Sequence, residues 1–377
     1  MSTQWKNLRL WLIKHQAISN SVKKASEIKR LDLSSLSLES LPENFSLLED
    51  LVILNLSNNK LSELPLSLKS LQKLNNLDIR RNAFKYIPLV LSDLKLGSIN
   101  LSGNQINDAN SLFDCKSLRV CDLSFNNLNK LSFNAKNHRN LRTLNLCGNF
   151  FKEIPEDLGK LEELQRLNLS QNILQEVSPV LASLHELIDI NLSDNQIESI
   201  DESFYTLVLE SIDLSANALK ELFLRGLEDL ESLTLDENPL KKIMLSDDFA
   251  PYLQEFSCDS CLLEYFVPFS SKRLESLCFS SNKISEIPGF INQYENLTQL
   301  DIENNLISEL PYNMTNMTRL QTLYIAGNPL NEDSKEVIKI LHPDICDQNM
   351  KTGIEIEEAS ADDLTQLAEM IGFLLQI

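Results

Sequence analysis

The chain has 377 residues, of which 43% are apolar, so it is long enough to bury a large core. Its 54 acidic and 34 basic residues give a formal net charge of −20, which disfavours general binding to nucleic acid or to an anionic membrane. Leucine supplies 72 residues and glycine only nine, a composition that excludes collagen-like chains and most glycine-rich phosphate loops.

The first segment, residues 1–27, is predicted to be a helical N-terminal cap. Apolar residues recur in it at helical spacing: Trp5, Leu8, Trp11, Leu12, Ile18, Val22 and Ala25. The segment lacks the apolar core and small-residue cleavage site of a secretory signal peptide. We expect its apolar face to pack on the element that follows.

Residues 28–330 repeat the pattern LxxLxLxxNxL fourteen times, and this repeat organises the chain. One clean copy runs from Leu51 through Leu54, Leu56 and Asn59 to Leu61. The ninth position advances in steps of 21 to 23 residues and is asparagine in twelve copies. Its occupants are Leu36, Asn59, Asn82, Asn104, Asn126, Asn149, Asn172, Asn195, Asn217, Asn238, Cys261, Asn282, Asn305 and Asn328.

Each position of the pattern has a physical role. The first, fourth and sixth residues are apolar and should face one shared core, while the residues between them alternate outward as in a β-strand. The ninth-position asparagine should be buried and bonded to the backbone of the adjacent turn, so that stacked copies form a ladder. Leucines at a spacing of three in the remainder predict short 3₁₀ or irregular turns. No single copy can bury its own core, so the copies must stack and be capped at both ends.

Residues 331–377 are predicted to be a C-terminal helical cap and an acidic tail. A short helix is expected over 334–343, and a terminal helix capped by Ser360 is expected near the end. The apolar stripe of this terminal helix comprises Leu364, Leu367, Ala368, Ile371 and Leu375. The stripe is compatible with a cap, a secretion signal or a binding element.

On these repeats, segment 28–330 resembles leucine-rich repeat proteins of the 22–23-residue class with Leu-Pro, as at Leu64-Pro65 and Leu310-Pro311. The resemblance implies an α/β fold, a right-handed solenoid whose parallel sheet lines a concave surface that usually binds protein. The tryptophan-bearing N-terminus and the tail GIEIEEASADDLTQLAEMIGFLLQI are similar to type IV-secreted effectors of intracellular bacteria. That similarity implies a cytoplasmic protein, or one translocated into a host cytoplasm by a non-Sec route.

The third, fifth, seventh and eighth positions are expected on or beside the concave face. The fifth is Asp or Asn in the first nine copies, which the stacking of short polar residues on a flat sheet explains. Partner recognition is therefore assigned to the exceptions. The candidate partner-binding residues are Arg30, Arg80, Arg81, Arg119, Phe125, Arg142, Arg166, Asp213, Asp236, Glu237, Asp259, Asp301, Glu303 and Tyr324.

The charged candidates predict a bipolar face, basic in its first half and acidic in its second. Such a field would steer and orient an oppositely bipolar partner. The alternatives are incidental charge order and arginines paired with nearby carboxylates. Phe125 is either an aromatic anchor or packed into the adjacent loop, and Tyr324 is either an anchor or a contact of the C-terminal cap.

No motif of a known catalytic site is present: GxxxxGK[ST], HExxH and GxSxG are all missing from the sequence. The seven cysteines are scattered, which favours a reducing compartment. Cys258 fills an apolar sixth position and Cys261 replaces a ladder asparagine, so these two and Cys278 do not predict zinc. Cys147 is predicted to be exposed at a seventh position. No catalytic residue, metal site or cofactor is therefore predicted.

We therefore expect a single solenoid domain that acts as a non-enzymatic protein-binding module. The leading hypothesis is a bacterial effector that binds a host protein on its concave face. An endogenous intracellular scaffold in small-GTPase or phosphatase signalling is the alternative, and an enzyme of unrecognised activity is more distant. Only 47 residues follow Leu330, too few for the catalytic domain of bacterial leucine-rich repeat ubiquitin ligases. No nucleic-acid partner and no membrane span are expected, and a monomer is favoured, although the stripe of 364–375 leaves self-association open.

Overall fold

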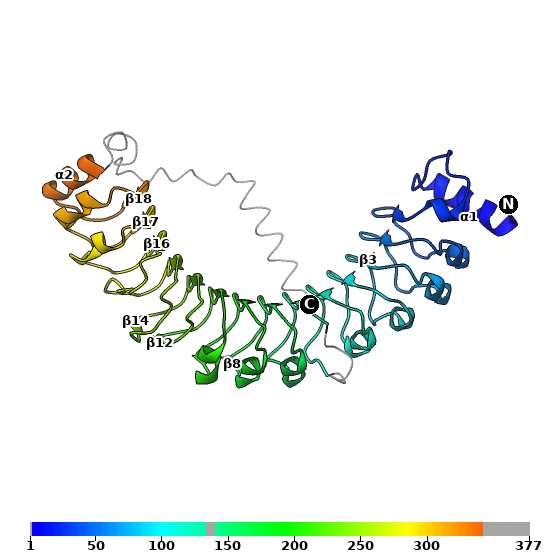
Figure 1. Cartoon of the computed structure of the whole chain (residues 1–377), viewed down its shortest axis with the longest axis horizontal. Coiled ribbons are helices and arrows are strands. Elements are labelled where there is room, and N and C mark those ends of the chain that lie inside the picture. The colour runs from blue at the N-terminus through cyan, green and yellow to red at the C-terminus, as the bar shows by residue number, and fades with distance from the viewer. Residues whose placement is uncertain (1, 133–139, 342–377) are drawn as a thin grey trace, which may run out of the picture.

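Fourteen short strands pair in parallel, in chain order, to form one continuous sheet. The computed structural model describes residues 2–132 and 140–341. The strands are β1 (Arg30–Asp32), β2 (Ile53–Asn55), β3 (Asn76–Asp78), β4 (Ser98–Asn100), β5 (Val120–Asp122), β6 (Thr143–Asn145), β7 (Arg166–Asn168), β9 (Asp189–Asn191), β11 (Ser211–Asp213), β13 (Ser232–Thr234), β15 (Glu255–Ser257), β16 (Ser276–Cys278), β17 (Gln299–Asp301) and β18 (Thr322–Tyr324). Each strand occupies positions three to five of the repeated pattern, and Figure 1 shows the strands lining the inner side of an open arc.

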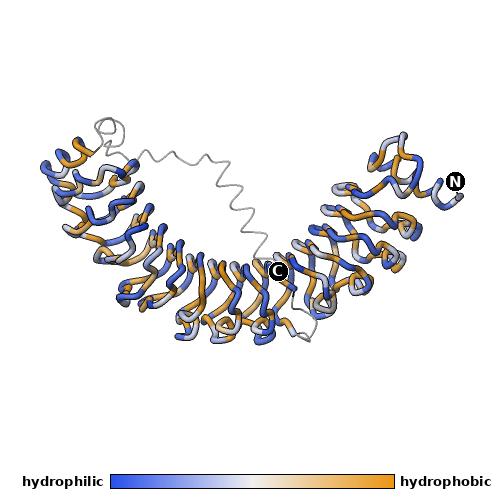
Figure 2. The backbone as a smooth tube through the Cα atoms, viewed as in Figure 1, coloured by the Kyte–Doolittle hydropathy of each residue, from blue (hydrophilic) through white to orange (hydrophobic). Residues whose placement is uncertain are grey.

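The core lies between this sheet and the outer side of the arc. In the copy of β2, the first, fourth and sixth residues (Leu51, Leu54 and Leu56) are fully buried, as the pattern predicts. The strands pair in register, so that Leu54 stacks between Leu31 and Leu77. Burying one such leucine stabilises the folded state by about 1.5–3 kcal/mol. Figure 2 shows hydrophobic and hydrophilic residues alternating along the backbone of the solenoid.

Short 3₁₀ helices cover most of the outer side. They are η1 (Ala25–Glu27), η2 (Glu43–Leu47), η3 (Leu66–Ser70), η4 (Leu89–Asp93), η5 (Asn110–Asp114), η7 (Glu156–Lys160), η8 (Pro179–Ser183), η9 (Glu202–Thr206), η10 (Ile291–Gln293) and η11 (Tyr312–Asn316). Several follow a proline whose carbonyl accepts the first bond of the turn, as Pro42 does from the Phe45 amide at 3.1 Å. Proline suits this place because its fixed φ continues into the turn and its missing N–H is not needed there.

Four outer segments of the described residues form short strands, which the sequence pattern did not predict. They are β8 (Glu176–Val177), β10 (Ser199–Ile200), β12 (Glu221–Leu224) and β14 (Lys242–Leu245). β8 pairs with β10, and β12 with β14. The sequences of β12 and β14, ELFL and KIML, alternate between exposed and more buried residues and contain no proline. That alternation favours an extended chain over a 3₁₀ turn.

The N-terminal segment is helical only in part, so the predicted helix over 1–27 is too long. α1 (Thr3–Lys14) buries Trp5, Leu8 and Leu12. The chain then turns at Gln16, whose φ of 57° interrupts the helix. The segment that follows contacts α1, because the Arg9 guanidinium donates a hydrogen bond to the Val22 carbonyl at 2.6 Å. The remaining residues of the predicted face, Ile18, Val22 and Ala25, still pack on the core, but not as part of α1.

The helix predicted over 334–343 is α2 (Glu332–Leu341), which begins two residues earlier. Its Ser334 is buried, and the hydroxyl accepts a bond from the Leu310 amide at 2.9 Å and donates to Asn331 Oδ1 at 2.7 Å. Val337 and Ile338 are buried as well, so α2 packs on the last copy. The terminal helix predicted from Ser360, with its stripe of 364–375, lies outside the described residues.

Candidate protein-binding surface

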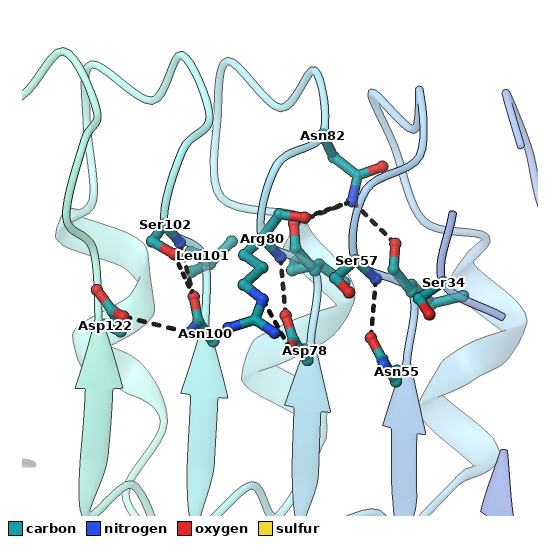
Figure 3. Close-up of polar contacts among 12 residues, drawn as sticks. Ser34, Asn55, Ser57, Asp78, Arg80, Asn82, Asn100, Leu101, Ser102 and Asp122 are labelled. Atoms are coloured by element: carbon teal, nitrogen blue, oxygen red, sulfur yellow. Dashed lines mark hydrogen bonds and ion pairs between the residues drawn. The ribbon is translucent and has the colours of Figure 1, made fainter. Parts of the chain in front are cut away.

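The ninth-position asparagines form the predicted ladder beneath the sheet. Asn172 is buried, and its Oδ1 accepts from the Phe151 amide of the preceding copy at 3.0 Å. Its Nδ2 donates to the carbonyls of Leu146 and Leu169, at 3.1 and 3.0 Å. Figure 3 shows Asn82 reaching back to backbone carbonyls in the same way. Each asparagine thus satisfies polar groups of two copies at once.

The uniform fifth position forms a second ladder at the carboxyl ends of the strands. Asn100 Oδ1 accepts from the Ser102 amide at 2.9 Å and from its hydroxyl at 2.7 Å. Asn100 Nδ2 also donates to Asp122 Oδ2 in the next strand at 3.2 Å, as Figure 3 shows. Because both aspartate and asparagine supply this acceptor, the fifth position has a structural reason to be uniform.

In two copies whose fifth position is not Asp or Asn, those of β13 and β15, an aspartate at the seventh position takes over, whereas the copy of β16 has Ser280 there. The copies of β13, β15 and β16 carry Thr234, Ser257 and Cys278 at position five. There, Asp236 Oδ1 accepts from the Ser257 hydroxyl at 2.6 Å and from the Asp259 amide at 2.7 Å. Asp259 Oδ1 accepts in turn from the Ser280 amide at 2.6 Å.

These bonds join one copy to the next, whereas the fifth-position bonds stay mainly within a copy. Asp236, Asp259, Asp213 and Asp301 therefore all accept internal hydrogen bonds. The sequence shows that aspartate moves from position five to position seven in the copies of β13 and β15. The hydrogen bonds to the next copy that follow from this shift were not predicted. Each of these carboxylates retains lone pairs for a partner, so the predicted role in binding stays a prediction.

The acidic candidates other than Asp213, which ends β11, lie at the carboxyl ends of β13 to β17. Burial, with the neighbouring charges of Asp236 and Asp301 adding to it, raises the pKa of Asp259 to about 6. Burial also raises the pKa of Asp301, and burial together with the Asp301 charge raises that of Glu303. Burial and the mutual repulsion of these carboxylates both disfavour their charged forms, so a cationic group placed beside them would be stabilising.

The basic candidates divide into three groups. Arg119, Arg142 and Arg166 lie in consecutive copies at the amino ends of β5 to β7, where the Arg142 amide donates to the Arg119 carbonyl at 2.9 Å. Arg80 and Arg81 lie beyond the carboxyl end of β3, and Arg30 is alone in β1. All six side chains are exposed.

Some of the arginines pair with carboxylates of the face, as one alternative anticipated. Arg80 lies 3.3 Å from Asp78 and Arg166 lies 3.9 Å from Asp189. Within the described part of the chain, Arg30, Arg81, Arg119 and Arg142 show no ion pair. Exposed pairs contribute little to stability, so these arginines are available to a partner at low cost.

The aromatic candidates are exposed but lie apart from the arginines. Phe125 is 56% exposed and has a φ of 52°, unusual for a bulky residue. Its ring lies over Gly148, where a Cβ would come within 2.5 Å of it. Phe125 follows β5 whereas Arg119 and Arg142 precede β5 and β6, so the sheet separates them despite their nearness in sequence. Tyr324 is 41% exposed in β18, beside Asp301 in register.

The prediction that Cys147 is exposed is wrong. Its side chain is buried, and burial raises the pKa of its thiol. Seventh-position side chains such as Ser124 and Ser170 are buried too, because this position packs against the equivalent residue of the next turn. In residues 2–132 and 140–341 no group of three or more metal-ligating side chains converges. In the same residues no helix is long and apolar enough to cross a membrane.

Three segments match sequence models of leucine-rich repeats: 50–71 (Leucine Rich Repeat), 139–197 (Leucine rich repeat) and 272–313 (Leucine Rich repeats, 2 copies). A leucine-rich repeat protein of Leptospira interrogans has a similar structure, with a TM-score of 0.75 and 27% identity over 83% of this chain and 81% of that one. An internalin of Listeria monocytogenes gives a TM-score of 0.62 and 20% identity over 90% and 92% of the two chains. Together with the 14-stranded parallel sheet, these matches identify a leucine-rich repeat protein with an α/β solenoid fold.

Two further similarities cover only part of the relative. The plant peptide hormone receptor RGFR1, solved in complex with RGF2, gives a TM-score of 0.65 and 26% identity over 82% of this chain and 53% of that one. The adenylate cyclase of Schizosaccharomyces pombe is 29% identical over 178 residues, which are 43% of this chain and 10% of that protein. The chain therefore spans about a tenth of this curated relative.

Proposed function

We propose that this protein is a non-enzymatic module that binds a protein partner on its concave face. A sheet of 14 strands spans an arc of roughly 60 Å, enough for an interface of about 800 Å² per partner. The two ladders hold that face in one conformation, which lowers the entropy lost on binding. The plant receptor with a similar solenoid, solved in complex with RGF2, supports a protein or peptide ligand.

The observation that carries the proposal is the separation of charge along the face. The basic group of Arg119, Arg142 and Arg166 lies at the amino ends of β5 to β7, and the acidic region lies at the carboxyl ends of β13 to β17. Two regions of opposite sign at opposite ends of the strands define a diagonal across the sheet. A partner with the complementary diagonal would be steered into one orientation.

The biological context that we propose is a bacterial effector that enters a host cell and captures a host protein. The tryptophan-bearing N-terminus and the acidic, apolar tail support this context, as does the similarity to a Leptospira protein. Translocation should then fail when residues 350–377 are deleted. Normal translocation of the truncated chain would contradict the role of the tail as a signal, and failure of the full-length chain to translocate would favour an endogenous bacterial scaffold.

Affinity capture from a human cell lysate, with mass spectrometric identification, tests the binding function. The variant carries Arg119→Glu, Arg142→Glu and Arg166→Glu. The matched control carries Lys69→Glu, Lys95→Glu and Lys152→Glu, which make the same charge change at exposed lysines outside the strands. We expect one stoichiometric partner that is retained by the control and lost by the arginine variant.

The association rate gives a second readout once the partner is purified. Removing the basic group should slow association on the order of ten-fold at low salt and much less at high salt. Equal loss of the partner in both variants would contradict concave binding. Capture of no partner from either a host or a bacterial lysate would contradict the binding module itself.

A further inference from the structure

Among the copies that follow the first, the asparagine ladder is interrupted in that of β15. In its neighbours, Asn238 Oδ1 accepts from the Leu219 amide at 3.1 Å and Asn282 Oδ1 accepts from the Leu263 amide at 3.0 Å. Cys261 stands at the equivalent position and offers no oxygen. Across the described residues, the equivalent amide, that of the fully buried Leu240, has no hydrogen-bond acceptor. The thiol of Cys261 makes only long contacts, 3.4 Å each, to the Leu235 and Asp259 carbonyls.

A second thiol lies directly against this position of the ladder. Cys258 occupies the sixth position of the same copy, is fully buried, and places its Sγ 3.1 Å from Cys261 Sγ. The turn brings sixth and ninth positions together in other copies too, since Asn238 Nδ2 donates to the Leu235 carbonyl at 2.9 Å. Of the fourteen copies, only this one carries cysteine at both positions.

We propose that Cys258 and Cys261 form an oxidisable dithiol that a small peroxide closes reversibly into a disulfide. The geometry supports this assignment because the two sulfurs lie 3.1 Å apart within one turn, about 1 Å beyond the length of a disulfide bond. The interruption of the ladder supports it independently, because the unpaired Leu240 amide makes this turn the place where the ladder opens most easily. Access to a small oxidant requires only such a local opening.

The reaction begins at Cys261, the less buried of the two sulfurs. The Cys258 thiol donates to Cys261, which lowers the pKa of Cys261 and raises that of Cys258. The Cys261 thiolate attacks one oxygen of hydrogen peroxide, the O–O bond breaks, and the second oxygen leaves as water after taking up a proton. The resulting sulfenic acid is attacked by Cys258, which loses its proton, and the sulfenic oxygen leaves as a second water. Two thiols and one peroxide thus give one disulfide and two waters.

The disulfide would act on the acidic region through the turn that it closes. That turn carries Asp259, whose amide donates to Asp236 and whose carboxylate accepts from the Ser280 amide. Oxidation also removes the S–H group that Cys261 directs at the Asp259 carbonyl. The dithiol therefore lies directly beneath the carboxylates that the proposed function assigns to partner binding, although the disulfide itself requires no partner.

The test exposes the full-length reduced protein to graded hydrogen peroxide, removes the peroxide with catalase, and alkylates the remaining thiols in denaturant. Tryptic peptide 243–272 contains both Cys258 and Cys261, whereas 143–152 and 274–283 contain Cys147 and Cys278 separately. A disulfide in peptide 243–272 is detected as a loss of two hydrogens and an absence of alkylation. We expect it to form at a rate on the order of ten-fold higher than the rate at which Cys147 and Cys278 are oxidised. Dithiothreitol should restore both thiols.

Cys261→Asn provides the matched variant, because it restores the ladder residue and is not expected to disturb folding. In this variant no loss of two hydrogens should occur in peptide 243–272. The proposal is overturned if both thiols of the unmodified sequence are still alkylated when Cys278 is half oxidised. It is also overturned if the peptide gains oxygen without losing two hydrogens.

Discussion

The copies of β2 to β9 and the segment of residues 209–273 share one core pattern but differ in everything that surrounds it. In the first region, prolines and 3₁₀ helices cover most of the outer side and fifth-position residues bond within their own copy. In the second region, β12 and β14 replace the 3₁₀ helices, seventh-position aspartates bond to the next copy, and the asparagine ladder is interrupted at Cys261. A hollow of about 600 Å³ also opens beside β14, lined among others by Ile243, Phe249 and Tyr265.

The difference shows which parts of the pattern are indispensable. The first, fourth and sixth positions stay apolar and buried in both regions, because no copy can close its core without them. The polar ladders can be rebuilt from other residues as long as each strand end finds an acceptor. The irregular segment therefore keeps the solenoid continuous while carrying the acidic region and the dithiol.

The largest expected effect comes from breaking the ladder in the regular region. Asn172→Ala should lower the free energy of unfolding by about 1–3 kcal/mol, because the buried Phe151 amide and two carbonyls lose the hydrogen bonds that Asn172 makes to them. Denaturant titration followed by circular dichroism measures the change. Gln175→Ala, at an exposed site in the next turn, is the control and should leave the midpoint unchanged. An unchanged midpoint for Asn172→Ala would refute the ladder.

The next effect tests whether the irregular segment depends on its relocated aspartate. Asp236→Ala removes the acceptor of the Ser257 hydroxyl and the Asp259 amide, and should cost about 1–2 kcal/mol of unfolding free energy. Glu237→Ala removes the same charge from the adjacent exposed residue and should cost much less. Equal midpoints for the two variants in denaturant titration would show that the hydrogen bonds of Asp236 do not stabilise the fold.

Much of the regular region could be predicted from the sequence, because its signals repeat every 21 to 23 residues. The strands and α2, to within two residues, were correctly anticipated, as was the burial of most ninth-position asparagines; Asn82, Asn195 and Asn328 are only half-buried. The end of α1 at Lys14 was not, because the bonds from Arg9 to the returning chain join residues without a periodic pattern. The burial of Cys147 was missed because it depends on the neighbouring turn rather than on the copy itself.

The candidate surface was predictable only in part. The residues at exposed positions were identified, and all six candidate arginines are exposed. Nearness in sequence does not show which candidates lie together, because Phe125 follows β5 whereas Arg119 and Arg142 precede β5 and β6. The bonds of Asp236 and Asp259 run between copies, so they could not be derived from one copy alone.

A substitution that makes the irregular segment more regular should stabilise it. Cys261→Asn supplies an acceptor for the Leu240 amide and donors for the Leu235 and Asp259 carbonyls. We expect a gain of about 1 kcal/mol in the free energy of unfolding under reducing conditions. Cys278→Ser, at a half-buried fifth position outside the ninth-position ladder, is the comparison and should change the midpoint much less. A lower midpoint for Cys261→Asn would mean that the turn has adapted to cysteine.

The smallest effect concerns the pH dependence of the acidic region. The pKa of Asp259 is raised to about 6 in the folded protein, above its value in an unfolded chain, so the folded state binds this proton more tightly. Its contribution to stability is therefore fully present near pH 4 and is lost as the pH rises through about 6.

Asp259→Asn keeps an oxygen for the Ser280 amide and should flatten this part of the pH profile. The change should be below about 1 kcal/mol, because the carboxylate is partly solvated. Thermal melts at several pH values measure it, with Asp194→Asn as the exposed control. A variant profile parallel to that of the unmodified sequence would contradict the assignment.

Amide hydrogen exchange resolved at single residues tests most directly whether the asparagine ladder is interrupted in the irregular segment. Leu219, Leu240 and Leu263 occupy the same position in three consecutive copies and are equally buried, but only Leu240 lacks an asparagine acceptor in the described structure. We predict that the Leu240 amide exchanges on the order of ten-fold faster than the other two, and that Cys261→Asn removes the difference. Equal protection of all three amides in the unmodified protein would contradict the claim that the ladder is interrupted at Cys261.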